Sequence, residues 1–363
     1  MTDEALTSRA LELAAEGIGR VSPSPLVGCV IVSTEGEIVG EGSYIFSEVT
    51  HAEIAALIQA GEKARGGTAY ISLEPHAHHG RTPPCTEALI NAGIRRVVSP
   101  IEDPNPLVSG KGFEELRNAG IEVVTGILCK AAEKQNEKFI CWHRKKRPFV
   151  HLKSAMSLDG KTAAFTGDSK WITSIEARTE GQRLRYEYDA IMVGAQTVAA
   201  DDPSLTDRTG GPRDRVLLRT VLDSTLRTSP DSVLVKTAGE YPTLFISKEP
   251  DPLKADTFRS AGAEVAVVEG GPRDPLSVLG ELYKRKITSV LVEGGPSVAG
   301  SFVDSGLIDK FTFFIAPVVI GGTSAPTAVG GTGVERLVDV LRLSDVTIEQ
   351  VGIDIMVTGY PAR

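Results

Sequence analysis

The chain has few cysteines and no excess of positive charge, and both absences narrow its function. Cysteine occurs at four of 363 positions, too few for a disulfide framework: Cys29, Cys85, Cys129 and Cys141. A net charge of -8 provides no general attraction to nucleic acid. No apolar run approaches the roughly 18 residues that a membrane span requires, and the acidic residues near the start are unlike a signal peptide. We therefore expect a cytoplasmic globular protein without a membrane or nucleic-acid partner.

The hydrophobic pattern predicts two α/β domains, at residues 1–146 and 147–363. In the first half, apolar runs typical of strands alternate with helical spacing at 4–17, 51–64, 85–92 and 112–119. In the second half, helices are expected at 174–188 and 297–305, between strands at 149–157, 190–193, 216–222, 243–247, 289–292, 311–315 and 346–358. This alternation favours largely parallel sheets. The basic residues 143–147, just before Pro148, are interpreted as a solvated linker.

Four of the six histidines lie in two short stretches of the first half. One stretch contains His51 and Glu53, and the other runs from residue 74 to Cys85 and contains His76, His78 and His79. A zinc deaminase needs three protein ligands and a glutamate that carries protons without binding the metal. His51, His76 and Cys85 can be the ligands and Glu53 the proton carrier, although His78 or His79 could replace His76. Cys85 opens a predicted helix, a position expected to favour its thiolate.

Residues 73–85, Leu-Glu-Pro-x-x-His-His-Gly-Arg-Thr-Pro-Pro-Cys, resemble the deaminase half of the bifunctional pyrimidine deaminase/reductase of riboflavin biosynthesis. The Asp-Pro-Asn-Pro loop at 103–106 matches this family as well. The resemblance implies a cytidine-deaminase-like three-layer domain that binds one zinc ion through His51, His76 and Cys85. The chain departs from the family pattern at four positions near these residues: Ser24, Tyr44, Thr50 and His76. Either the metal site is retuned to His-His-Cys, or the deaminase is decaying beside a working reductase.

The second half resembles the reductase domain of the same family, in segments 157–160, 169–173, 194–198, 201–206, 221–224 and 292–295. This resemblance implies a dihydrofolate-reductase-like α/β fold that uses NADPH to reduce a ribosyl group to ribityl. The glycine pair at 294–295 before a predicted helix could approach a phosphate, but taken alone it is weak evidence. The expected substrate is a phosphorylated pyrimidine ribosylamine, and a homo-oligomer is expected.

The resemblance also implies individual roles in the reductase half. Cofactor contacts are expected at Ala155, Trp171, Thr197, Ser224, Gly295, Pro296, Ser297, Val298, Ala299, Gly300 and Ser301. Substrate contacts are expected at Ser169, Arg185, Asp201, Leu205, Arg208 and Glu293. Asp201 can transfer a proton, and Arg185 and Arg208 can hold a phosphate with paired donors. Core packing is the alternative for Trp171, and a simple turn is the alternative for residues 201–203.

Overall fold

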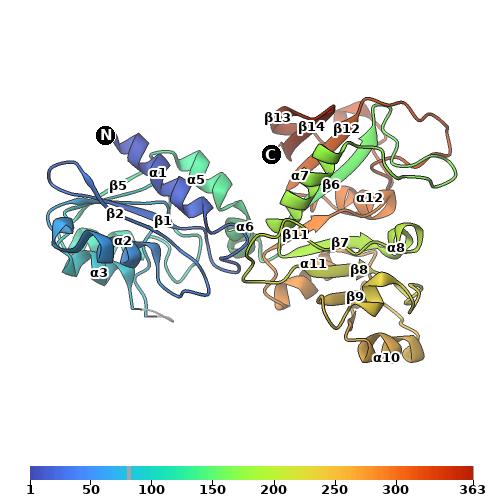
Figure 1. Ribbon diagram of the computed structural model, residues 1–363, viewed down its shortest axis with the longest axis horizontal. Coiled ribbons are helices and arrows are strands. Elements are labelled where there is room, and N and C mark those ends of the chain that lie inside the picture. Colours follow the sequence, from blue (N-terminus) through green and yellow to red (C-terminus); the bar gives the residue numbers. More distant parts are fainter. Residues whose placement is uncertain (80–82, 363) are drawn as a thin grey trace. The chain divides into compact units, whose positions relative to one another are not determined.

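The computed structural model describes residues 1–79 and 83–362, which form two units (Figure 1). The first unit is Met1–Lys146 together with Pro212–Arg215, and the second is Arg147–Gly211 together with the chain from Val216 onward. A single boundary after residue 146 therefore does not account for the short segment Pro212–Arg215. Within the described residues, no helix has the length and apolar character needed to cross a membrane.

The first unit is built on a five-stranded sheet in the order β2-β1-β3-β4-β5. Its strands are β1 (Gly28–Val32), β2 (Ile38–Ser43), β3 (Thr68–Ile71), β4 (Arg96–Ser99) and β5 (Glu122–Thr125). β1 runs antiparallel to both β2 and β3, whereas β3, β4 and β5 are parallel. The expectation of a largely parallel sheet is therefore wrong for half of the strand pairs. The short turn at 33–37 explains one of these pairs, because so short a connection can only join antiparallel strands.

Helices cover both faces of this sheet and make three layers (Figure 1). α1 (Asp3–Ala15) and α5 (Cys129–Gln135) lie on one face. The other face carries α2 (Ala52–Ala60), the short helix η1 (Gly61–Ala64), α3 (Cys85–Asn91) and α4 (Lys111–Asn118). β1 is buried on both sides, which explains its unbroken apolar sequence. A Cβ on Gly42 would lie 2.3 Å from the Ala52 carbonyl oxygen, so glycine lets the start of α2 approach β2 closely.

The basic stretch predicted as a linker is instead the end of helix α6 (Glu137–Lys145). Phe139 and Cys141 of this helix are buried in the first unit. Just before the helix, the Asn136 side chain bonds both the N–H and the carbonyl of Leu26, each at 2.9 Å. The basic residues lie in the last turn, where positive charge interacts favourably with the helix dipole. α6 is therefore an integral part of the first unit.

The second unit is built on a nine-stranded sheet in the order β10-β9-β8-β7-β11-β6-β12-β14-β13. The parallel strands are β6 (Phe149–Ser157), β7 (Ala190–Gly194), β8 (Leu218–Leu222), β9 (Thr243–Ser247), β10 (Glu264–Val267), β11 (Ser289–Val292) and β12 (Lys310–Ala316). β13 (Leu343–Val351) and β14 (Asp354–Pro361) form an antiparallel hairpin, where one continuous strand stretch was expected. Gly352 has a positive φ of 62° and allows the chain to reverse there.

Helices also cover both faces of the second sheet, over two separate hydrophobic clusters. They are α7 (Ile175–Tyr186), α8 (Ala195–Asp201), α9 (Val233–Lys236), α10 (Pro252–Ser260), α11 (Pro275–Lys284) and α12 (Pro296–Asp304), followed by the short helix η2 (Leu337–Asp339). α8 follows directly from β7, and α12 begins shortly after β11. Because β7 and β11 are parallel neighbours, residues that follow them meet at the same edge of the sheet.

Candidate active sites

His51, His76 and Cys85 form one cluster, in which the potential ligand atoms all lie within 4.8 Å of one another. His51 is the residue before α2, His76 lies in the loop after β3, and Cys85 is the first residue of α3. The Cys85 N–H donates to the His76 carbonyl at 3.1 Å, which connects the two ends of the intervening loop. The fold therefore brings His76 next to Cys85 despite their long separation in sequence.

The other two histidines of the loop lie outside this cluster. The His79 ring nitrogen Nε2 lies 3.4 Å from an oxygen of Glu87, and the His79 side chain is three-quarters exposed. The His78 ring stands edge-on to the ring of His76, with 5.4 Å between the ring centres. The structure thus brings His76, rather than either neighbour, next to His51 and Cys85.

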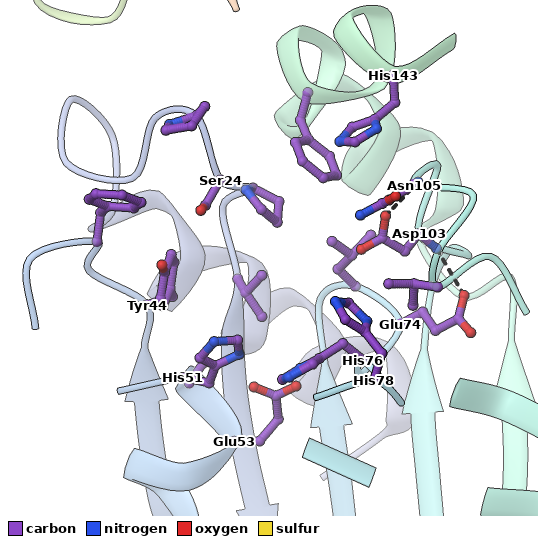
Figure 2. Close-up of a pocket in the computed structure, with 18 of the residues that line it drawn as sticks. Ser24, Tyr44, His51, Glu53, Glu74, His76, His78, Asp103, Asn105 and His143 are labelled. Atoms are coloured by element: carbon purple, nitrogen blue, oxygen red, sulfur yellow. Dashed lines mark hydrogen bonds between the residues drawn. The ribbon is translucent and has the colours of Figure 1, made fainter. Parts of the chain in front are cut away.

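Glu53 lies beside the cluster at the floor of a cavity (Figure 2). Its side chain is 2% exposed, and its Oε2 atom has no hydrogen-bond partner within the described residues. A buried carboxylate oxygen without a partner is costly unless a ligand or a proton occupies it. Two imidazoles, one thiol and this carboxylate are the set of groups that a zinc deaminase requires, so these residues fit a zinc ion.

Burial controls the protonation of both His76 and Cys85. It raises the pKa of the Cys85 thiol well above its usual value, and the neighbouring Glu53 carboxylate adds to this effect. Burial therefore opposes the effect expected of the helix start, which favours the thiolate that zinc requires. Burial also lowers the pKa of His76 to about 4, with a smaller contribution from His51. His76 is consequently neutral at pH 7, as a metal-binding imidazole must be.

The cavity above the cluster has a volume of about 320 Å³. Two of the family departures, Ser24 and Tyr44, line this cavity, and Thr50 borders a second hollow next to His51. Asp103, Asn105 and His143 line the opposite wall (Figure 2). Burial raises the pKa of Asp103 to about 7 and lowers the pKa of His143 to about 4. Sequence reasoning missed His143, because the residue lay in the supposed linker.

Glu74 holds two walls of this cavity together. Its carboxylate accepts hydrogen bonds from the main-chain N–H groups of Asp103, Gly110, Gly112 and Phe113, at distances between 2.9 and 3.3 Å. A Cβ on Gly112 would lie 2.0 Å from the Pro75 carbonyl oxygen, so only glycine fits there. Glu74 thereby ties the loop with His76 to the loop with Asp103 and Asn105, a role that the sequence analysis did not identify.

In the second unit, a partly buried ion pair lies at the carboxyl ends of β7 and β11. Arg185 donates from Nε and Nη2 to the two oxygens of Glu293, at 2.9 and 3.0 Å, and from Nη1 to the Thr206 carbonyl at 3.1 Å. Lys153 Nζ lies 3.6 Å from Glu293. Burial opposes ionisation of Glu293, but Arg185 and Lys153 outweigh it and lower the pKa of Glu293 to about 2. The paired donors of Arg185, expected to hold a phosphate, thus hold Glu293.

Asp201 and Trp171 lie on partly exposed segments of the second unit. Ser169 Oγ donates to the Asp201 carboxylate at 3.3 Å, and Lys170 Nζ donates to the Asp201 carbonyl at 3.2 Å. Trp171 is 69% exposed, with the Arg178 guanidinium 4.7 Å from its ring centre. Core packing, the alternative considered for Trp171, is therefore wrong. Arg208 is exposed, and its main-chain N–H donates to Gln182.

The expected cofactor residues fall into an open group and a buried group. Gly295 N–H donates to Thr197 Oγ1 at 3.2 Å, and a Cβ on Gly295 would meet only that atom, at 3.5 Å. This open turn before α12 fits a phosphate of NADPH. By contrast, Ala299 and Gly300 are buried, and a Cβ on Gly300 would collide with the backbone at 330–331. Both residues therefore pack inside the unit, and their contact with the cofactor stays a prediction.

The remaining expected contacts are dispersed along the unit. Ala155 pairs with Phe314 across β6 and β12, and Ser301 Oγ donates to the Val298 carbonyl. The Ser224 carbonyl accepts hydrogen bonds from Ser247 and Lys248. Leu205 is 3% exposed and packs in the core, so its side chain is not available to a substrate in this conformation. Sequence reasoning also missed Lys153, although a lysine within a predicted strand was a usable signal.

Each half of the chain matches a known protein family. Residues 1–100 match the cytidine and deoxycytidylate deaminase zinc-binding region, and residues 148–357 match the RibD C-terminal domain. The riboflavin biosynthesis protein RibD of Bacillus amyloliquefaciens is 44% identical over 360 residues, which cover 99% of this chain and 96% of that protein. RibD of Escherichia coli is 41% identical, with 98% of each chain covered.

Two solved structures resemble this one over nearly the full length of the chain. Acinetobacter baumannii RibD superimposes with a TM-score of 0.87 at 35% identity, covering 99% of each chain. A Thermotoga maritima diaminohydroxyphosphoribosylaminopyrimidine deaminase/5-amino-6-(5-phosphoribosylamino)uracil reductase also gives 0.87, at 36% identity and 99% coverage of each chain. These likenesses bear out the cytidine-deaminase-like and reductase domains expected from the sequence. The chain therefore belongs to the RibD family of bifunctional riboflavin biosynthesis enzymes, which combine a zinc-dependent deaminase with an NADPH-dependent reductase.

Proposed function

We propose that residues 1–146 carry out the deamination and that the chain from residue 147 carries out the reduction. The proposed substrate is 2,5-diamino-6-(5-phosphoribosylamino)pyrimidin-4-one, in keeping with the name of the Thermotoga relative. It would lose a ring amine as ammonia, and its ribosyl group would then be reduced to ribityl by NADPH. The single observation that carries the deaminase proposal is the convergence of His51, His76 and Cys85 beside the buried, unpartnered oxygen of Glu53.

In the deamination, His51, His76 and Cys85 would hold the zinc ion. Bound zinc supplies the Lewis acidity that activates water near neutral pH. Glu53 takes the proton from the attacking water and delivers it to the departing amine, because its free oxygen is buried next to the cluster. Tyr44 and the Glu74-tied loop enclose the cavity and limit access of other water molecules.

Ammonia release from the purified full-length protein, with and without NADPH, tests the deaminase. We expect release from the wild type without NADPH, and a loss of at least about 100-fold in Glu53→Gln. Zinc content should be the same in both proteins, because Glu53 is not a ligand. Full activity in Glu53→Gln would contradict the assigned role. A monofunctional reductase with an inactive first unit is the alternative, and it predicts no zinc-dependent ammonia release from any version.

In the reduction, we assign proton transfer to Asp201 and substrate binding to Ser169, Arg208 and the Arg185–Glu293 pair. Glu293 stays anionic at neutral pH and can orient a ribosyl hydroxyl. NADPH supplies the hydride. Asp201→Asn should lower the reductase rate by about 100-fold or more, without changing ammonia release. Equal loss of both activities would indicate misfolding instead. Arg208→Ala should weaken substrate binding more than NADPH binding, and the reverse result would refute this assignment.

We also propose a homo-oligomer, which joins through the outer hairpin of the second sheet. β13 is an edge strand, and Val346, Ile348 and Ile355 of the hairpin are exposed apolar residues. An uncovered edge of this kind is a template for pairing with another chain. Ile348→Glu should shift the light-scattering mass to that of a monomer, and an unchanged mass would place the interface elsewhere. Absence of nucleic-acid binding and a cytoplasmic location stay predictions, and RNA binding at physiological salt would contradict the first.

A further inference from the structure

A buried arginine in the second unit has no part in the assignments above. Arg219, in β8, is 1% exposed. Across the described part of the chain, its hydrogen bonds all go to neutral oxygens, namely the hydroxyls of Thr237 and Thr243 and the carbonyls of Ser204, Leu234, Thr237 and Tyr241. Burial lowers the pKa of Arg219 to about 10, and Tyr241 and Glu240 only partly offset this effect. The guanidinium is thus charged at pH 7, buried, and bound mainly to the main chain.

One of these contacts joins Arg219 to the segment next to Asp201 in the reductase site. Arg219 Nη1 donates to the Ser204 carbonyl at 3.1 Å, in the loop 202–206 that follows Asp201, the last residue of α8. Two residues of this loop, Asp202 and Leu205, have positive φ angles of 41° and 50°. A positive φ is uncommon in residues other than glycine, and one as bulky as Leu205 holds it only where its surroundings fix it. The loop therefore requires external anchors.

Helix α9 provides a second anchor for the same loop. The Asp202 carboxylate accepts a hydrogen bond from the N–H of Val233, the first residue of α9, at 2.9 Å. Arg219 Nη2 binds the carbonyls of Leu234 in α9 and of Thr237 just after it, each at 3.2 Å. Arg219, α9 and Asp202 thus form a closed ring of contacts around residues 203 and 204.

We infer that Arg219 is a positioning residue for the reduction, which fixes the loop that follows Asp201, and with it the end of α8, through the Ser204 carbonyl and α9. This inference rests on the proposed role of Asp201. Within the described residues, the Asp201 carboxylate accepts one long hydrogen bond, from Ser169 at 3.3 Å, so its place depends largely on its own backbone. A lysine cannot replace Arg219, because one ammonium group cannot reach all the oxygens that the planar guanidinium joins.

Arg219→Lys in the full-length enzyme tests the inference. The reductase kcat should fall about 10- to 100-fold, the range expected when a reacting group is misplaced by about 1 Å. The NADPH dissociation constant, measured by fluorescence titration, should stay within about twofold. Leu282→Ala is the matched control, because it truncates a fully buried side chain in α11 and should lower the melting temperature without lowering kcat. A lowered melting temperature with wild-type kcat in Arg219→Lys would overturn the inference, as would a parallel loss of NADPH binding.

A double-mutant cycle with Asp201→Asn shows whether Arg219 acts through Asp201. Arg219→Lys should cost much less in the Asp201→Asn background than in the wild type, and equal factors in both would overturn the inference. An unchanged kcat in Asp201→Asn alone removes the proposed role of Asp201, whereas an impaired Asp201→Asn with an unimpaired Arg219→Lys removes only the tether. If Arg219→Lys does not fold, Asp202→Ala tests the ring from its exposed side. A several-fold drop in kcat with normal NADPH binding supports the inference, and wild-type kcat overturns it.

Discussion

Replacing Glu74 by glutamine should loosen the deaminase cavity and destabilise the first unit. The Glu74 carboxylate accepts two main-chain N–H groups on each oxygen, from Asp103 and Gly110 on one and from Gly112 and Phe113 on the other. In glutamine one of these oxygens becomes an amide donor, so two buried N–H groups lose their acceptor and face another donor. Each unsatisfied buried group costs about 1–3 kcal/mol, so the substitution should cost about 2–6 kcal/mol.

The two tryptophans allow this cost to be measured in the first unit alone. Trp142 lies in the first unit and Trp171 in the second, so Trp142 fluorescence in a Trp171→Phe background reports urea unfolding of the first unit. Glu62→Gln is the control, because it makes the same change of charge on a side chain that is 96% exposed. It should change the free energy of unfolding by less than about 0.5 kcal/mol.

Activity assays complete the test in proteins that retain Trp171. Glu74→Gln should lower the rate of ammonia release, because the loop with Asp103 and Asn105 forms one wall of the cavity. The reductase rate should be unchanged, since the substitution lies in the other unit. If Glu74→Gln costs no more than Glu62→Gln, the hydrogen bonds to Glu74 do not hold the loop, and the reasoning is refuted.

Three further predictions concern the metal cluster and two carboxylates. The wild type should copurify with less than stoichiometric zinc, and His76→Cys should raise this content, because a thiolate binds zinc more tightly than an imidazole; a zinc content unchanged in His76→Ala would exclude His76 as a ligand. Glu293→Gln should cost about 3–5 kcal/mol at pH 7 by leaving Arg185 uncompensated. Because the Glu293 pKa is lowered from 4.5 to about 2, this difference should be complete above pH 4.5 and disappear as pH falls toward 2. Asp103 has a pKa raised from 3.8 to about 7, so native stability should fall as pH rises through that window and Asp103→Asn should remove this dependence in urea titrations.

The closeness of the ligands in sequence explains why the metal cluster could be predicted. His51 and Glu53 are close in sequence, and His76 and Cys85 are separated by a single loop. The two segments follow β2 and β3, so their meeting needed only the pairing of these strands with β1 between them. The protonation of Cys85 could not be predicted in the same way. It depends on burial by elements from the whole unit, and that burial opposes the local effect of the helix start.

Long-range contacts explain most of what the sequence did not reveal. Arg185 and Glu293 are 108 residues apart, and nothing in either segment indicates that the arginine binds the glutamate rather than a phosphate. Helix α6 was missed because its basic end resembles a solvated linker, although its first turns contain the buried Phe139 and Cys141. The hairpin β13–β14 was merged into one stretch because strand-like residues flank Gly352 on both sides.

The distribution of the four departures from the family pattern bears on whether the deaminase is retuned or decaying. Ser24, Tyr44 and His76 line the cavity, and Thr50 borders the adjoining hollow. The groups that hold the cavity in shape are intact, since Glu74 keeps its four main-chain hydrogen bonds and Gly112 fits against Pro75. A domain that no longer served as an enzyme would not be expected to keep these supporting contacts. The departures are therefore better explained by a change in how the site binds metal than by loss of the site.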